Sequence, residues 1–264
     1  MVILFSATLL LSATLVFFIQ PVVGKLLIPY LGGTPAVWNT CLVFFQGMLL
    51  LGYLYAHVLG KYFSRRIQLV FHLGMMFFVL LLFPMDFQKY IVMEKFFHEP
   101  IIWILRLLII VVGLPFLIVT ATAPLLQKWF SYANKDFGRD PYFLYSASNF
   151  GSLLALVSYP LIFEMFCTLA TQQVLWRAGY WLLFFAVGVC GLFMIKGRQK
   201  DLAHDLVTEI NENIDNKPGP LQKKQIISWV LLAALPSSLL YGITDYLSTH
   251  VAAVPLFWVI PLIL

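Results

Sequence analysis

Long apolar runs separated by shorter polar links follow one another along the whole chain. A helix that spans a bilayer needs about 20 predominantly apolar residues, and most of these runs reach that length. The pattern therefore predicts an all-α fold, a polytopic membrane helical bundle of about eight transmembrane helices. The expected spans cover residues 2–30, 36–59, 67–87, 101–126, 142–166, 173–195, 226–246 and 251–264.

The first and the last run differ in length from the others. The first is longer than a span requires, so we expect it to tilt or to break near Gln20 and Pro21. The last covers only residues 251–264 and has no polar flank. We therefore expect the chain to stop inside a helix or to be a truncated product.

One long polar segment, residues 196–225, divides the spans into two groups. Leu202, Leu206, Ile210 and Ile214 recur within it every four residues, which predicts a short amphipathic helix. This helix is expected to rest on the membrane surface or to bind a partner. We expect a six-helix membrane bundle (1–195), a cytoplasmic linker (196–225) and the first two helices of a second, incomplete half (226–264). Such a layout is typical of transporters built from two six-helix halves.

The positive charges of the links favour one side of the membrane. Of the 17 Lys and Arg residues, three lie in residues 60–66, three in 127–139 and six in 196–225, against five elsewhere. Cytoplasmic loops carry an excess of Lys and Arg. We therefore expect the N-terminus, these basic links and the long polar segment to lie in the cytoplasm.

Composition supports the membrane class and excludes several others. The chain is 61% hydrophobic and 11% charged, with a mean hydropathy of +0.88, so too little polar surface remains for a soluble domain. The net charge of +5 comes from the basic links and does not indicate a nucleic-acid partner. Cys41, Cys167 and Cys190 have no paired spacing, so we expect no metal site and no disulfide. The sequence also lacks nucleotide-binding loops and hydrolase motifs, so we expect no catalytic residue and no cofactor.

Four ionisable residues lie inside apolar runs, where a charge is costly unless it is paired or hydrated. They are Lys25, Arg106, Glu164 and Asp245, and the expected orientation puts each near the outer end of its span. Two are basic and two are acidic. We therefore predict a charge network at the outer mouth, in which Lys25 and Asp245 are partners. Alternatively, Lys25 and Arg106 extend separately to the membrane interface along their apolar stems.

Uncharged polar residues inside the spans are candidates for a solute path. They are Gln20, Asn39, Gln46, Thr120 and Asn149. Gln20 adjoins Pro21, and Thr120 lies between Pro115 and Pro124. Prolines free backbone carbonyls inside a helix, and broken helices commonly form transporter sites. Interhelical hydrogen bonds would explain each residue as well. Small residues are expected to let helices approach closely, among them Gly47, Gly52 and Gly151.

Six blocks of sequence carry a family resemblance. They are residues 20–25 (QPVVGK), 31–39 (LGGTPAVWN), 52–57 (GYLYAH), 122–130 (TAPLLQKWF), 140–152 (DPYFLYSASNFGS) and 235–244 (LPSSLLYGIT). Together they resemble the membrane portion of bacterial spermidine-synthase-like membrane proteins, a family related to the major facilitator superfamily. The resemblance implies a major-facilitator-like six-helix half with the start of a second half, in the bacterial inner (plasma) membrane. In that family a cytoplasmic aminopropyltransferase-like domain often follows. This sequence ends before such a domain, so the resemblance implies no enzymatic activity here.

Three interpretations of function remain open. The first is a transporter-like module for a small polar or charged solute, polyamine-like by family analogy, with Lys25, Glu164 and Asp245 gating or binding it. The second is a membrane anchor or delivery platform for a spermidine-synthase-like enzyme, which would be a cytoplasmic partner. The third is a truncated, non-functional product of either. All three share the lipid bilayer as a partner.

Overall fold

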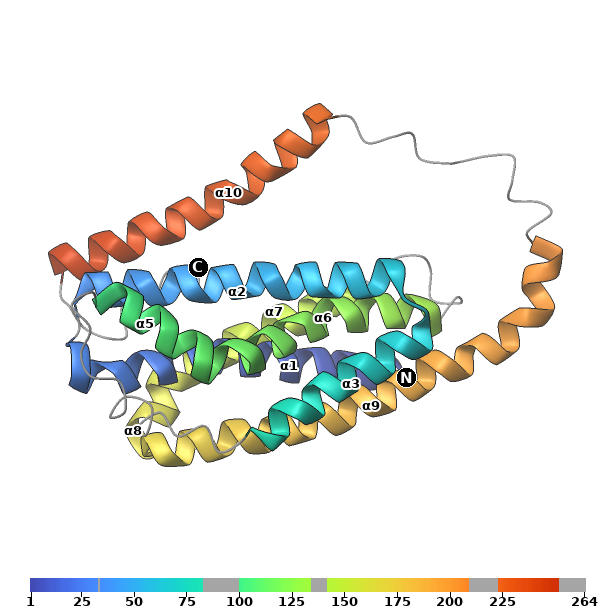
Figure 1. Ribbon diagram of the computed structural model, residues 1–264, viewed down its shortest axis with the longest axis horizontal. Helices are drawn as coiled ribbons and strands as arrows, with labels where there is room; N and C mark the ends of the chain where they lie inside the picture. Colours follow the sequence, from blue (N-terminus) through green and yellow to red (C-terminus); the bar gives the residue numbers. More distant parts are fainter. Residues whose placement is uncertain (33, 83–99, 134–141, 209–222, 252–264) are drawn as a thin grey trace.

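The computed structural model describes residues 1–32, 34–82, 100–133, 142–208 and 223–251. Within these ranges the regular structure is helical, with π-helical segments between some α-helices and no strand (Figure 1). The elements in chain order are α1 (Val2–Leu31), α2 (Pro35–Tyr62), α3 (Arg65–Leu81), α5 (Pro100–Leu108), η1 (Ile109–Gly113), α6 (Leu114–Ala133), α7 (Tyr142–Ser158), η2 (Tyr159–Phe163), α8 (Glu164–Phe166), α9 (Leu169–Thr208), α10 (Lys223–Tyr246) and η3 (Leu247–Val251).

Six helical stretches are long and apolar enough to cross a membrane. They are Val2–Leu31, Pro35–Tyr62, Ile101–Ala133, Phe143–Phe166, Leu169–Lys196 and Ile227–Tyr246. The prediction of a multi-pass helical membrane protein is therefore confirmed, whereas the predicted number of eight spans is not. Helix α3, which overlaps the expected third span, has 17 residues and is shorter than these six. Residues 252–264 of the expected eighth span lie outside the described residues.

Helix α1 runs without interruption through two prolines. Pro21 and Pro29 both lie inside it, so the expected break near Gln20 is not present. The Gln20 side chain donates from Nε2 to the Val16 carbonyl at 3.3 Å, in the turn that precedes Pro21. Neighbouring helices enclose this part of α1, and such packing keeps a proline-containing span helical.

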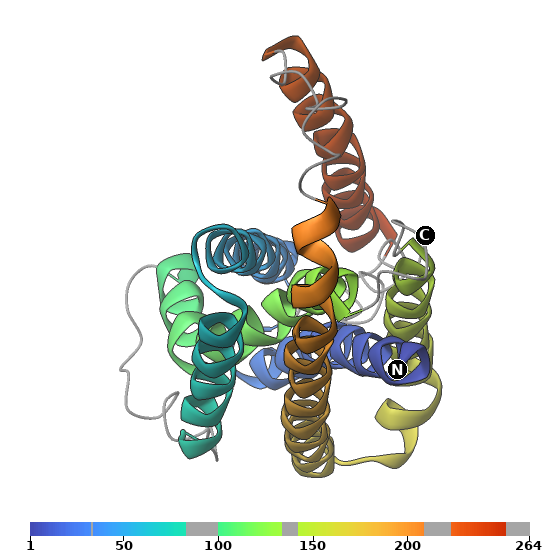
Figure 2. The same ribbon diagram turned by 90° about the vertical axis from the view of Figure 1, so that its right-hand side faces the viewer.

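Helix α1 also forms the core of the bundle. It packs against α7, α9 and α6, while α2 packs on α6 and α3 packs on α9 (Figures 1 and 2). Phe5, Leu9 and Leu27 of α1 are fully buried. A helix that is apolar all round either faces lipid or is enclosed by other helices, and α1 is of the second kind.

Two glycines allow the closest approaches between helices. A methyl group on Gly52 of α2 would overlap the Thr120 hydroxyl of α6. A methyl group on Gly151 of α7 would overlap the Leu10 carbonyl of α1. The packing role expected for these two glycines is confirmed. Gly47 has open space around its Cα, so the same prediction is wrong for that position.

The last described helix stands apart from the bundle. In Figure 1, α10 approaches the rest of the structure at its C-terminal end, beside the start of α2. Helix α9 continues past residue 195 to Thr208, so the sixth span and the start of the polar segment form one helix. Ile210 and Ile214 of the expected amphipathic stripe lie outside the described residues. Below, the "Lys25 end" is where α1 finishes and α2 begins, and the "Gly60 end" is where α2 finishes and α3 begins.

Candidate functional site

A lysine and a glutamate from distant parts of the sequence form an ion pair at the Lys25 end. Lys25 Nζ of α1 donates to Glu164 Oε1 of α8 across 3.1 Å. The side chains are 32% and 26% exposed, so the pair is neither sealed in the core nor fully in solvent. Pairing is what makes charges tolerable among apolar helices. It is the one ion pair found among the described residues.

Aromatic packing and a π-helical turn set the position of Glu164. Segment η2 ends at Phe163, directly before Glu164. The rings of Tyr159 and Phe163 pack edge-on against Phe18 of α1, with centroids 5.6 Å and 4.8 Å away. Gln172 of α9 donates from Nε2 to the Phe163 carbonyl at 3.0 Å. These contacts hold the glutamate against α1, and π-helical turns are frequent at functional sites.

Asn39 and Asp245 make a second polar contact at the same end. Asn39 Nδ2 donates to Asp245 Oδ1 at 2.9 Å and so joins α2 to α10. The neighbouring Trp38 packs with Leu42 and with Leu156 of α7, which holds the first turns of α2 in place. The other side-chain atom of the amide, Asn39 Oδ1, is buried and has no hydrogen-bond partner.

The four predicted intramembrane charges are therefore not joined in the way the sequence suggested. Lys25 contacts Glu164 instead of Asp245, and Asp245 contacts Asn39. The expected Lys25–Asp245 contact is not formed. Arg106 lies exposed on α5, and the polar contacts of the other three charges do not include it. Opposite charge identifies possible partners, but helix packing decides which of them meet.

The five uncharged candidates do not converge on one site. Gln20 and Thr120 are buried, and each donates to a carbonyl three or four residues earlier in its own helix. Gln46 on α2 and Asn149 on α7 are exposed. Only Asn39 contacts one of the charged candidates. A continuous solute path through these residues stays a prediction.

A buried polar network at the Gly60 end was not recognised in the sequence. Gln68 and His72 of α3 are 1% and 0% exposed. Gln68 accepts a hydrogen bond from Trp129 Nε1 at 3.0 Å and donates to the Phe63 carbonyl at 2.8 Å. Two polar residues four positions apart in an apolar run share one helix face, and this spacing could have revealed them.

The hydrogen bonds around His72 fix its proton position. Thr122 donates its hydroxyl hydrogen to the Ile118 carbonyl at 2.9 Å, so its oxygen accepts from His72 Nε2, 3.1 Å away. With Nε2 protonated in the neutral ring, Nδ1 accepts from the Tyr55 hydroxyl at 3.3 Å. The imidazole thus links α3 to α2 and α6, and its arrangement is that of a satisfied structural histidine.

Two cations hold the α2–α3 link to the end of α6. The Lys128 ammonium donates to the Gly60 carbonyl at the C-terminal end of α2, where positive charge is favourable. The Arg65 guanidinium lies over the Tyr132 ring, 4.3 Å from its centroid. Both residues belong to links for which the sequence predicts a cytoplasmic location, and here they also act as packing contacts.

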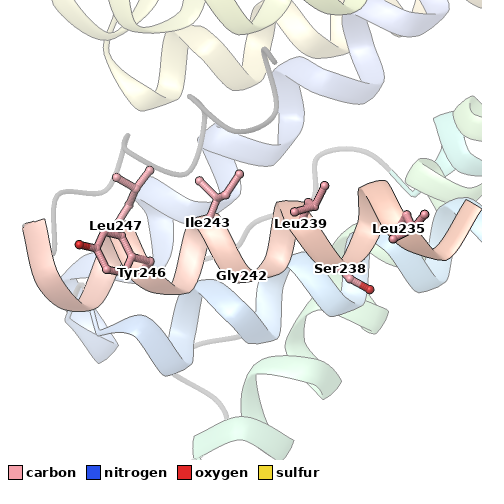
Figure 3. Close-up of a pocket in the computed structure, with 7 residues that line it drawn as sticks. All are labelled: Leu235, Ser238, Leu239, Gly242, Ile243, Tyr246 and Leu247. Carbon is pink, nitrogen blue, oxygen red and sulfur yellow. The ribbon is translucent and has the colours of Figure 1, made fainter.

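An open hollow of about 400 Å³ runs along α10 and η3. Figure 3 shows that Leu235, Leu239, Ile243 and Leu247 follow one another along it. Its described lining comes from this one helical stretch and is mostly apolar, so it lacks the converging polar groups of a solute site. Thr244 and Asp245 do not line it.

The described residues contain no group of three or more His, Cys, Asp or Glu that could hold a metal ion. Cys41, Cys167 and Cys190 are free thiols. No protein-family model, no curated protein and no solved structure matches this chain. The site's own geometry therefore has to support the functional interpretation.

Proposed function

We propose that this chain is a transporter-like membrane module that handles a small polar or charged solute at the Lys25 end. The observation that supports this proposal is the Lys25–Glu164 ion pair. Its partners come from α1 and α8, and their side chains are about one-third exposed. Full enclosure of an ion pair carries a desolvation cost, which further hydrogen bonds must offset, and it fixes the two charges to each other. A partly open pair can instead exchange its partner for a charged group of a solute.

The Asn39–Asp245 contact supports the same interpretation. It connects α10 to the bundle at the same end, and its carboxylate is an intramembrane charge of the kind that marks substrate and ion pathways. The proposal includes a major-facilitator-like arrangement, with the Gly60 end in the cytoplasm and the Lys25 end outside. Polyamines are the first solutes to test because of the resemblance to spermidine-synthase-like membrane proteins.

A flux assay with the full chain reconstituted in liposomes tests this function. Uptake of putrescine, spermidine, an amino acid and a sugar would be compared between wild type, K25A and E164Q. We expect uptake of at least one solute, and a loss of about tenfold or more in both variants. Arg66→Ala is the matched control, because Arg66 is an exposed cation at the opposite end and should be replaceable without loss.

The alternative function, a membrane anchor for a cytoplasmic enzyme, predicts a different outcome. Folded wild-type protein would then transport none of the four solutes. Equal flux in wild type, K25A and E164Q would also contradict the proposal, since the ion pair would then have no part in solute handling. Circular dichroism of each preparation checks that a loss of flux is not a loss of folding.

A further inference from the structure

Helix α10 contacts the bundle through its polar end. From Ile227 to Leu239 its described side chains are exposed, whereas Thr244 is fully buried and Asp245 is half-buried near α2. Apolar packing would have buried the leucines of this helix instead. The position of α10 on the bundle is therefore set by a hydrogen-bonded contact, as expected for a carboxylate that cannot face hydrocarbon.

Besides the second N–H of the Asn39 amide, Asn39 and Asp245 offer hydrogen-bond acceptors to a third group. The Asn39 Nδ2 atom points at the carboxylate, which leaves Asn39 Oδ1 as the free atom of the amide. That oxygen is buried without a partner. Turning the amide over would place its oxygen against the carboxylate, so the observed orientation is favoured. The carboxylate itself has capacity for several more hydrogen bonds.

Among the described residues no cation forms an ion pair with Asp245, and Arg106, on α5 beside α2, is not one of its hydrogen-bond partners. Lys25 is engaged in its own ion pair. Helix α2, on which Asp245 packs, carries its lysine, Lys61, at the far end, and Lys224 lies at the opposite end of α10. His250, in η3, stacks on an aromatic ring of the preceding turn. A carboxylate whose described partner is a neutral amide is an incomplete site.

We propose that Asn39 and Asp245 form a binding site for one positively charged group, either an alkali-metal ion or the ammonium group of a solute. Carboxylate and amide oxygens are hard ligands that suit both. Asp245 supplies the charge, and Asn39 Oδ1 supplies a second oxygen that the protein leaves unpartnered. The site's role in transport rests on the proposed function. It adds to that function the requirement that the solute, or an ion transported with it, is positively charged.

Thermal unfolding of the full chain in nanodiscs of zwitterionic lipid tests the site directly. The apparent Tm is measured in the chlorides of sodium, potassium, methylammonium and choline at equal ionic strength. Choline has no N–H group, so it cannot donate a hydrogen bond to the carboxylate. We expect at least one of the other three cations to raise Tm by about 2–4 °C in a saturable way. A response to sodium or potassium identifies an alkali ion, and a response to methylammonium identifies an amine.

Three variants connect the response to the residues. D245N keeps a hydrogen-bonding side chain but removes the charge, so it should abolish the shift. The exchange variant N39D/D245N keeps one carboxylate and one amide across the same contact and should retain it. E164Q should lose flux but keep the cation response, which separates failure of this site from failure of the proposed function.

Two outcomes would overturn the proposal. One is a wild-type Tm that is the same in all four salts, a result that does not depend on whether any variant folds. The other is a D245N protein that keeps the full shift, which would place the bound cation elsewhere. If the protein transports a solute but no cation shifts its Tm, the proposed function stands and the cation site at Asp245 is excluded.

Discussion

Removing Lys25 should destabilise the protein chiefly because Glu164 is left without a partner. Two unit charges 3.1 Å apart attract by about 5 kcal/mol at an effective dielectric constant near 20, and by about 1.3 kcal/mol in water. The side chains are about one-third exposed or less, so solvent screening places the real value towards the lower figure. We expect a coupling free energy of about 1–3 kcal/mol between the two side chains.

A double-mutant cycle measures this coupling. The free energies of unfolding of wild type, K25A, E164A and K25A/E164A would be compared by titration with denaturing detergent in mixed micelles. The double variant should lose less stability than the two single variants added together, because neither charge is then left unpaired.

The matched cycle with K25A and D245A decides between the structure and the pairing first suggested by the sequence. Lys25 and Asp245 are not in contact, so their effects should add within about 0.5 kcal/mol. A coupling below that value for Lys25 and Glu164, or a larger coupling for Lys25 and Asp245, would refute the assignment of the ion pair.

Two further predictions concern the packing that holds the site in place. Replacing Thr122 by Val should cost about 1–3 kcal/mol of unfolding free energy, because the fully buried His72 loses the acceptor of its Nε2–H. T40V, which removes only a bond within one helix, should cost less than about 0.5 kcal/mol in the same titration, and equal losses would exclude the proposed role of His72. G151A should destabilise by about 1–3 kcal/mol through its clash with α1, whereas G47A should be neutral or stabilise by up to about 1 kcal/mol. The same sign for both glycine variants would contradict the helix contact.

The apolar runs predicted the class of protein well, because membrane insertion depends on the length and composition of each segment taken alone. The described helices follow most of the expected spans closely; Phe143–Phe166, for example, lies within the expected 142–166. Of the two outcomes expected for the first span, a tilt or a break near Pro21, the break is not present, because the surrounding helices keep this proline-containing segment helical. The domain boundaries, the membrane orientation and the family resemblance stay predictions.

The candidate site was only partly accessible from the sequence. Intramembrane charge drew attention to Lys25, Glu164 and Asp245, since an ionisable residue among apolar ones is conspicuous in any sequence. Their partners could not be read in the same way. No sequence feature distinguishes Asn39 from the four other uncharged candidates. A histidine within an apolar run, such as His72, carries no signal of the helices it will contact.

The sequence by itself determined that this chain is helical and membrane-embedded, because hydrophobicity acts on each segment separately. Tertiary structure alone decided which residues meet: Lys25 with Glu164, Asn39 with Asp245, and His72 with Thr122. Helices that are apolar on nearly every side have no periodic face to indicate their neighbours. Their contacts depend instead on where a glycine permits close approach and where a polar group finds a partner across the interface.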